Sequence, residues 1–308
     1  MQPACYDARM KIIKLATILF ALVLCYSVVG SSAEQASEKI RVVVSIPPFA
    51  KFVQEIAREL AETQVMVPPG ANPHIYEPTP AQLQYLERAQ LYIATGTGIE
   101  FEIAWLSKLK DINKNVHFVN GSDGIDLIQP LNQEGAGRHH ENVAGDPHVW
   151  LSPKNAITIV RNIEKALNSV DPENQNFYAE NAQNFEQELK ALDETIRTQL
   201  SQLSGRSFLV YHPAWGYFAH EYNLSEVSIE MDGKEPSARY LAEVIELSND
   251  NNIRAVVISP QFSQKSAQMI ASEIGAEIIH ANELSEDYIE SLRNFSDHLS
   301  RVLSDESR

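Results

Sequence analysis

The stretch FEQELKALDETIRTQLSQL, residues 185–203, decides how the chain is organised. Its apolar residues recur at spacings of 4, 3, 4, 4 and 3, which place them on one face of a helix. They are Phe185, Leu189, Leu192, Ile196, Leu200 and Leu203. We therefore predict that most of Pro172–Leu203 forms a single helix, about 45–50 Å long at a rise of about 1.5 Å per residue.

Strand and helix patterns alternate on both sides of this helix. The predicted strands are Ile40–Ile46, Thr63–Val67, Leu91–Thr95 and Val116–Asn120 before it, and SFLVYHP (207–213), EVSIE (226–230), RAVVISP (254–260) and AEIIHAN (276–282) after it. Such alternation is typical of parallel sheets covered by helices. The prediction is an α/β protein of two βα lobes with mostly parallel sheets, joined by one long rigid helix. The N-terminal lobe spans 34–170, the linking helix 171–204 and the C-terminal lobe 205–308.

The N-terminus has the pattern of a secretory signal peptide. From Met10, where we place the start, two lysines precede an apolar run from Leu15 to Val29 and the small residues Ser31-Ser32-Ala33. The run is short for a bilayer span, so we expect residues 1–33 to be removed and the protein to reside in the periplasm. Lipidation at Cys25 is not expected, because Leu24 stands where a small residue normally precedes the lipidated cysteine.

The charge and cysteine content restrict the partners. The whole chain carries −16, and residues 1–33 carry +2, so the remainder carries −18. Such a surface repels nucleic acid and attracts cations, so we expect no nucleic-acid partner. Both cysteines, Cys5 and Cys25, lie in the predicted signal peptide, which excludes disulfides and thiolate metal ligands from the mature protein.

Three histidines stand where loops follow or precede predicted elements, and each has a proline neighbour. They are His74, His148 and His212. A single histidine near a strand end is more often a hydrogen-bonded core residue than a ligand. Three such residues in similar surroundings favour a metal site, because neutral imidazole suits zinc. We expect Glu77 and Asp146 to accept the other ring N–H of a ligating histidine and so fix its tautomer.

Four segments resemble the metal-binding extracytoplasmic proteins of zinc and manganese ABC importers. They are NPHIYEPTPAQ (72–82), DPHVWLSP (146–153), YHPAWGYFA (211–219) and GKEPSARYL (233–241), and the similarity covers nearly all of Ile40–Leu303. The resemblance implies two βα lobes joined by a long helix, with the metal held between them by His74, His148 and His212. It also implies a partner, the membrane permease of an ABC importer. We expect a monomer that binds metal without catalysing a reaction.

The fourth ligand departs from the family pattern. Relatives often supply an aspartate in a DPL segment, whereas HANELSEDY (280–288) has Asn282 at that position and Glu283 in place of the proline. Asn282, Glu283 and water are therefore the alternatives for the fourth position. Three imidazoles and a neutral donor favour Zn²⁺ as the transported ion, with Mn²⁺ as the alternative.

Two further interpretations concern other parts of the chain. His139 and His140, in GAGRHHENVAG (135–145), resemble a reduced form of the histidine-rich loop of zinc-selective relatives, and such a loop would capture zinc transiently. A secreted three-histidine zinc hydrolase is the competing function, but the sequence contains no HExxH motif. The remaining histidines we interpret as structural; they are His117, His220, His280 and His298.

Overall fold

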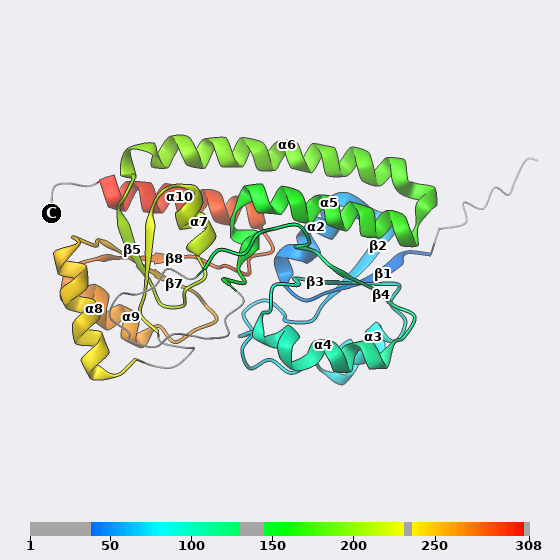
Figure 1. Ribbon diagram of the computed structural model, residues 1–308, viewed down its shortest axis with the longest axis horizontal. Coiled ribbons are helices and arrows are strands. Elements are labelled where there is room, and N and C mark those ends of the chain that lie inside the picture. The colour runs from blue at the N-terminus through cyan, green and yellow to red at the C-terminus, as the bar shows by residue number, and fades with distance from the viewer. Residues whose placement is uncertain (1–37, 130–144, 231–235, 305–308) are drawn as a thin grey trace, which may run out of the picture. The chain divides into compact units, whose positions relative to one another are not determined.

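The computed structural model describes residues 38–129, 145–230 and 236–304 (Figure 1). From Lys39 onward the chain packs as one compact unit that contains two four-stranded parallel sheets. The predicted signal peptide, the Cys25 position and the His139–His140 loop lie outside the described residues. Within those residues no helix is both long enough and apolar enough to cross a bilayer.

The first sheet has the strand order β2-β1-β3-β4. Its strands are β1 (Ile40–Val44), β2 (Ala61–Val65), β3 (Leu91–Ala94) and β4 (His117–Asn120). The helices between and after them are α2 (Pro47–Ala57), α3 (Pro80–Leu86), α4 (Glu100–Ile112) and α5 (Pro153–Val170). β3 is buried along its whole length and β1 nearly so, as expected for central strands covered on both faces.

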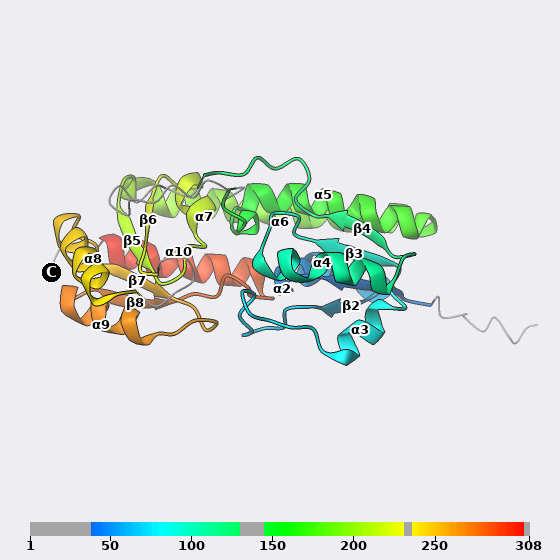
Figure 2. The same cartoon turned by 60° about the horizontal axis from the view of Figure 1, so that its bottom comes forward.

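The second sheet repeats this order as β6-β5-β7-β8. Its strands are β5 (Ser207–Val210), β6 (Ser225–Ser228), β7 (Ala255–Ile258) and β8 (Glu277–His280). Its helices are α7 (Gly216–Glu221), α8 (Ala238–Asp250), α9 (Lys265–Ile274) and α10 (Tyr288–Ser304), and Figure 2 shows α8 and α9 on the same side of this sheet. In both sheets the order reverses between two central strands, and ligands of such sheets bind beyond the carboxyl ends at that reversal.

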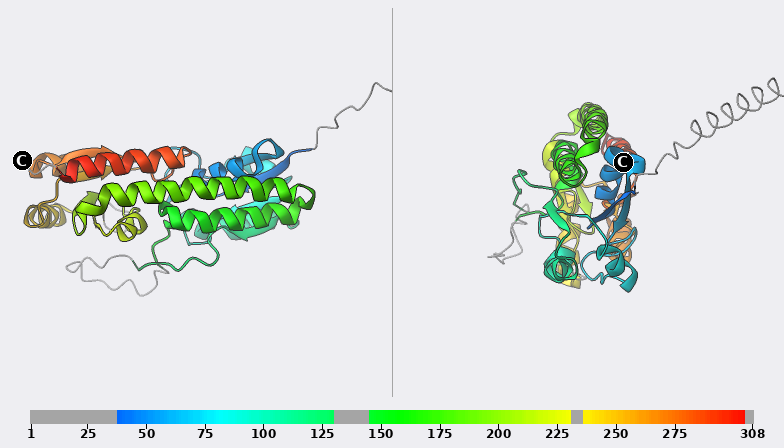
Figure 3. Two further views of the ribbon diagram at one scale, coloured as in Figure 1. Left: turned by 90° about the horizontal axis from the view of Figure 1, so that it is seen from above. Right: turned by 90° about the vertical axis from the view of Figure 1, so that its right-hand side faces the viewer.

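The predicted long helix is α6 (Gln175–Leu200), with single 3₁₀ turns at Pro172–Asn174 and Ser201–Leu203. Its apolar stripe packs against α2 and α5 of the first half and α10 of the second (Figure 3, left, with α10 in red and α5 and α6 in green). The predicted fold class is thus confirmed. One continuous apolar core includes buried residues of both sheets, such as Val43 and Val257, so α6 covers a shared interior.

Candidate metal centre

The loop that carries His74 is held in place by one buried glutamine. Gln82, on α3, donates through Nε2 to the carbonyls of Val65 (2.8 Å) and Met66 (2.7 Å) at the end of β2. Its Oε1 accepts from the backbone N–H of Thr79 (2.9 Å), and the Thr79 hydroxyl caps α3 in return. Both ends of the loop are therefore tied to the same side chain, which fixes the position of His74 between them.

His148 is positioned by a tight turn before α5. Asp146 Oδ1 accepts from the backbone N–H of His148 (2.9 Å) and lies 2.9 Å from the His148 Nδ1 atom. The Asp146 carbonyl accepts from the Tyr217 hydroxyl (2.8 Å). A Cβ atom on Gly216 would lie 2.5 Å from Asp146 Oδ2, so only glycine permits this approach of α7. Asp146 occupies the place predicted for it beside His148.

A second acid lies behind Asp146. Glu226, on β6, accepts from the backbone N–H of Trp215 (2.9 Å), and its Oε2 is 3.4 Å from the same Gly216 Cβ position. Burial, together with the charge of Asp146, raises the pKa of Glu226 to about 8. At neutral pH the Glu226 carboxyl is therefore mostly protonated, and it adds no second negative charge beside Asp146.

His212 follows β5 directly and is 8% exposed. Its Nδ1 lies 2.7 Å from Oε1 of Glu230, which is 6% exposed and lies just beyond β6. Phe262, in the loop after β7, stacks on the His212 ring with centroids 4.4 Å apart and an interplanar angle of 23°. The imidazole is thus fixed by a carboxylate at one nitrogen and by an aromatic ring on one face.

His74 completes the pattern, but its carboxylate is not the one predicted. Its Nδ1 lies 3.0 Å from Oε1 of Glu100, at the start of α4. Glu77, predicted for this role, is exposed. The chain turns between His74 and α3 and carries the Glu77 side chain to the surface. Glu100 lies near His74 only because β3 is next to β1 in the sheet, which the local sequence does not reveal.

Each of the three histidines therefore has a carboxylate at Nδ1. The carboxylates, Glu100, Asp146 and Glu230, accept hydrogen bonds from these nitrogens when the nitrogens carry the proton. The Nε2 lone pairs are then free to coordinate a metal. Carboxylate–histidine pairs of this kind orient the ligands and raise their basicity in metal sites.

The three rings converge on a single cavity. His148 Nε2 lies 3.3 Å from His212 Nε2, and the ring centroids of His74 and His212 are 4.9 Å apart. Two nitrogens bound to zinc at about 2.0–2.1 Å with a tetrahedral angle would lie about 3.3 Å apart. No group of three or more His, Cys, Asp or Glu side chains in the described ranges is already arranged as a complete metal cage. The His148–His212 pair has the required separation, and the other donors must adjust around it.

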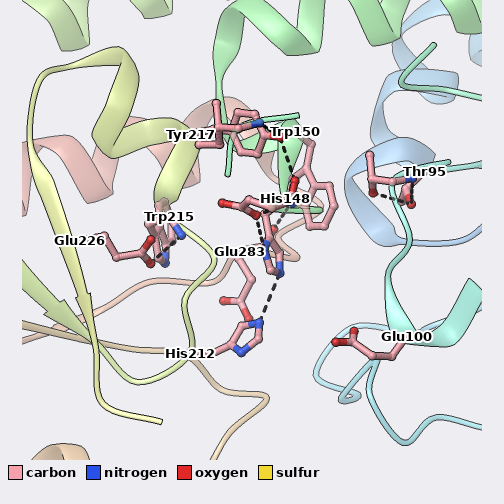
Figure 4. Close-up of polar contacts among 12 residues, drawn as sticks. Thr95, Glu100, His148, Trp150, His212, Trp215, Tyr217, Glu226 and Glu283 are labelled. Atoms are coloured by element: carbon pink, nitrogen blue, oxygen red, sulfur yellow. Dashed lines mark hydrogen bonds and ion pairs between the residues drawn. The ribbon is translucent and has the colours of Figure 1, made fainter. Parts of the chain in front are cut away.

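Glu283 is one of two carboxylates that line this cavity, and the other is Glu100. It lines the cavity with the three histidines, is 4% exposed, and its Oε2 has no hydrogen-bond partner. Burial raises the pKa of Glu283, and a hydrogen bond with Ser259 opposes this effect. Figure 4 shows Glu283 gathered with His148 and His212, with Glu100 on the other side. A buried carboxylate oxygen whose lone pairs accept no hydrogen bond can act as a metal ligand.

Asn282, expected at the fourth position, does not line the cavity. Its Oδ1 accepts from Gln261 Nε2 (2.6 Å) and from the backbone N–H of Leu284 (3.0 Å). The asparagine therefore forms a turn with its own backbone, as this residue type commonly does. That turn directs the next side chain inward, so the structure places Glu283, and not Asn282, beside the histidines.

The electrostatics of the cavity differ from one histidine to the next. Burial alone would lower the pKa of His74, but the hydrogen bond and charge of Glu100 outweigh it, and the pKa is raised. The pKa of His212 is well below its usual value, because burial disfavours the charged ring and the neighbouring His148 and His74 add repulsion. The pKa of Glu100 is lowered in spite of its burial, because His74 stabilises the carboxylate. Protonation thus occurs more readily at His74 than at His212.

The cavity is small and largely apolar. Its volume is about 10 Å³, and its walls include Ile46, Ile99, Trp150, Phe262 and Leu284. Trp150 is fixed by its Nε1, which donates to the Glu283 carbonyl (2.8 Å). A larger hollow of about 600 Å³, lined by residues of α8, α9 and α10, contains no histidine among its described walls. The small cavity is therefore the one that contains the three histidines singled out by the sequence.

The remaining histidines that the structure describes lie away from the cavity. His117, His220, His280 and His298 are all exposed, as expected of residues without a ligand role. Sequence reasoning missed Glu100, Glu230 and Phe262. The strand-end rule that selected His212 would also have found Glu230, which closes the EVSIE strand pattern.

The structure is a two-sheet α/β protein in which three histidines, each paired with a carboxylate, line one cavity. Residues 42–302 match the model of the family described as zinc-uptake complex component A, periplasmic. The chain belongs to this family. It is therefore a component of the binding-protein class of zinc-uptake systems, and the competing hydrolase interpretation finds no support among its relatives.

Three similar proteins illustrate the relationship. The high-affinity zinc uptake system protein ZnuA of Bacillus subtilis is 31% identical over 84% of this chain and 85% of its own length. The zinc-binding lipoprotein AdcA of Streptococcus pneumoniae is 30% identical over 85% of this chain, but only 53% of AdcA is matched. A crystal structure of ZnuA superimposes with a TM-score of 0.80 at 36% identity, covering 87% of this chain and 100% of that one.

Proposed function

We propose that this protein captures one Zn²⁺ ion with the Nε2 atoms of His74, His148 and His212 and the carboxylate of Glu283. It then delivers the ion to the membrane permease of an ABC importer. The observation that carries this proposal is the set of three Nδ1–carboxylate pairs, which leave the Nε2 atoms of three cavity-lining histidines without a carboxylate partner. Lone pairs directed at one another in a dry cavity repel unless a cation or a proton lies between them.

The donor set favours zinc over manganese. Three imidazoles and one carboxylate are a common zinc set, whereas Mn²⁺ prefers several oxygen donors. The acidic groups also balance the charge of the ion. Glu100, Asp146 and Glu230 surround the histidines, so a divalent cation reduces the repulsion among them.

A binding role explains the cavity better than catalysis does. A catalytic zinc keeps an open position for water and substrate, and a cavity of about 10 Å³ has no room for a substrate beside the ion. We propose that the protein is not an enzyme, acts as a monomer and functions in the periplasm after removal of residues 1–33. His139 and His140 would collect zinc outside the cavity.

Capture uses the chain's own proton equilibria. Zinc binds the neutral form of each ring, so any proton on His74 must leave as the ion enters. Glu100, Asp146 and Glu230 keep the Nδ1 protons in place during this exchange and hold the rings in orientation. Burial raises the pKa of the Glu283 carboxyl, and a cation bound beside it lowers that pKa again because it stabilises the carboxylate form.

Isothermal titration of the metal-free protein with Zn²⁺ tests the proposal. We expect one site per chain, weakened roughly 100-fold or more when any one of the three histidines is replaced by alanine. Glu283→Gln should weaken binding more than Asn282→Ala, since only Glu283 lines the cavity. His280→Ala, an exposed histidine, is the matched control and should leave binding unchanged. Full zinc affinity in the His148→Ala and His212→Ala variants would overturn the proposal.

A further inference from the structure

Phe262 touches two of the three histidines and forms no part of their hydrogen-bond network. Its ring stacks on His212 at 4.4 Å and meets the edge of His74 at 5.8 Å, with an interplanar angle of 65°. It also lies 6.1 Å from Tyr211 in a tilted arrangement. The ring therefore fills the space beside the imidazoles at the point where the central strands β5 and β7 end.

The described walls leave little free space around the histidines. The cavity between them has a volume of only about 10 Å³. An ion bound by three imidazoles and one carboxylate could sit there once the donors adjust around the His148–His212 pair. An ion that needs two further water ligands could not, because the apolar walls leave no room for them.

Among the aromatic walls Phe262 is the less buried one. Trp150 is almost fully buried and hydrogen-bonded to the Glu283 carbonyl, and Ile46 is buried at the end of β1. Phe262 is only partly buried and lies in the loop between β7 and α9. Its aromatic ring contributes bulk at the site without a polar bond of its own.

We propose that Phe262 is a specificity-determining residue that limits the bound ion to four ligands and so favours Zn²⁺ over Mn²⁺. This inference rests on the proposed function. Zinc is satisfied by four ligands in a tetrahedral arrangement, whereas manganese prefers an octahedral set of oxygen donors that includes water. By occupying the positions of the extra waters, the Phe262 ring raises the free energy of the six-coordinate complex and leaves the four-coordinate complex unaffected.

Co²⁺ provides a direct probe of the number of ligands. Four-coordinate Co²⁺ gives intense visible absorption bands, and six-coordinate Co²⁺ gives weak ones. We expect intense bands from the Co²⁺-loaded wild type and much weaker bands from Phe262→Ala, in which water enters the coordination sphere. Titration should show the ratio of Zn²⁺ to Mn²⁺ affinity falling by about tenfold or more in Phe262→Ala, through tighter Mn²⁺ binding.

Two variants control the experiment. Phe262→Leu restores most of the lost bulk and should return the intense Co²⁺ bands and the zinc preference. Phe118→Ala removes an aromatic ring that stacks on Tyr92 at 4.7 Å in the first sheet, and should change neither. Intense bands and an unchanged Zn²⁺ to Mn²⁺ ratio in Phe262→Ala would overturn the inference. Failure of the wild type to bind Zn²⁺ and Co²⁺ would overturn the proposed function instead.

Discussion

The absence of a side chain at Gly216 leaves room for Asp146 at the candidate metal centre. Its conformation is one that any residue adopts, so the requirement for glycine comes from the close approach of Asp146 Oδ2, which lies 2.5 Å from where a Cβ atom would stand. That carboxylate orients His148 through Nδ1. A side chain at Gly216 would displace Asp146, and His148 would lose the carboxylate that orients it.

We predict that Gly216→Ala weakens zinc binding by about 10–100-fold, the usual effect of disturbing a residue that orients a metal ligand. Isothermal titration measures the change. Gly205→Ala is the control: Gly205 has a φ of +79° and open space around it, so alanine there costs stability without reaching the site. Equal zinc affinity in wild type and Gly216→Ala would contradict the argument.

The pair of His74 and Glu100 predicts how zinc affinity changes with pH. The pKa of His74 is raised above its usual value of 6.5. Protons therefore begin to compete with zinc for His74 above pH 6.5, and zinc affinity falls as the pH is lowered further. Glu100→Gln removes the carboxylate that raises the pKa of His74. We expect this variant to bind zinc more weakly at high pH but to lose affinity only at a lower pH than the wild type.

Measuring Kd across the pH range tests this shift. Glu77→Gln is the matched control, because Glu77 is exposed and lies in the same loop as His74. It should reproduce the wild-type curve. A Glu100→Gln curve displaced to weaker binding by the same amount at every pH would show that Glu100 does not set the pKa of His74.

At the scale of elements, the loop between β2 and α3 depends on Gln82. This side chain is 6% exposed and hydrogen-bonds the backbone at both ends of the loop. Gln82→Ala removes the donor to the buried Met66 carbonyl, at a cost of about 1–3 kcal/mol, whereas the Val65 carbonyl still accepts from Gln64 Nε2 (2.9 Å). We predict that the free energy of unfolding falls by about 2 kcal/mol and that zinc affinity falls with it, because His74 is less firmly held.

Urea unfolding and zinc titration of the same preparations measure the two effects. Gln187→Ala, at an exposed position of α6, is the control and should change stability by no more than about 0.5 kcal/mol. A Gln82→Ala protein of wild-type stability would contradict the role of this residue in holding the loop.

The elements themselves could be predicted well from the sequence, whereas two of the polar partners could not. Helical and strand periodicity follow from local spacing, so α6 and the strands of both sheets lie close to their expected positions. The side chains of Glu77 and Asn282 lie away from the histidines, and of the alternatives left open for the fourth position only Glu283 lines the cavity. Which carboxylate faces a histidine depends on how a loop turns and which strands are neighbours, and a change of one residue, from Asn282 to Glu283, reverses the direction of the side chain.

For the molecule as a whole, the shared core predicts cooperative behaviour. Buried residues of both sheets belong to one apolar cluster, and α6 packs against helices from both halves of the chain. We predict a single calorimetric unfolding transition for the metal-free protein. Free zinc at a thousandfold excess over Kd should then stabilise the folded state by about 4 kcal/mol, since the unfolded chain does not hold the site together.

Differential scanning calorimetry with and without zinc tests both statements. Two separate transitions, only one of them moved by zinc, would contradict cooperative unfolding through the cluster that both sheets share. The Glu188→Ala variant, altered at an exposed position of α6, should behave as the wild type does in both conditions.

The dispersal of the donors along the chain has a consequence for the life of the protein. His74, His148, His212 and Glu283 lie in four distant segments, so a fragment that a protease releases from the middle of the chain lacks part of the set. On the proposed ligand set, a chain cut between any two of these segments would hold zinc only while its pieces stay packed together around the shared core.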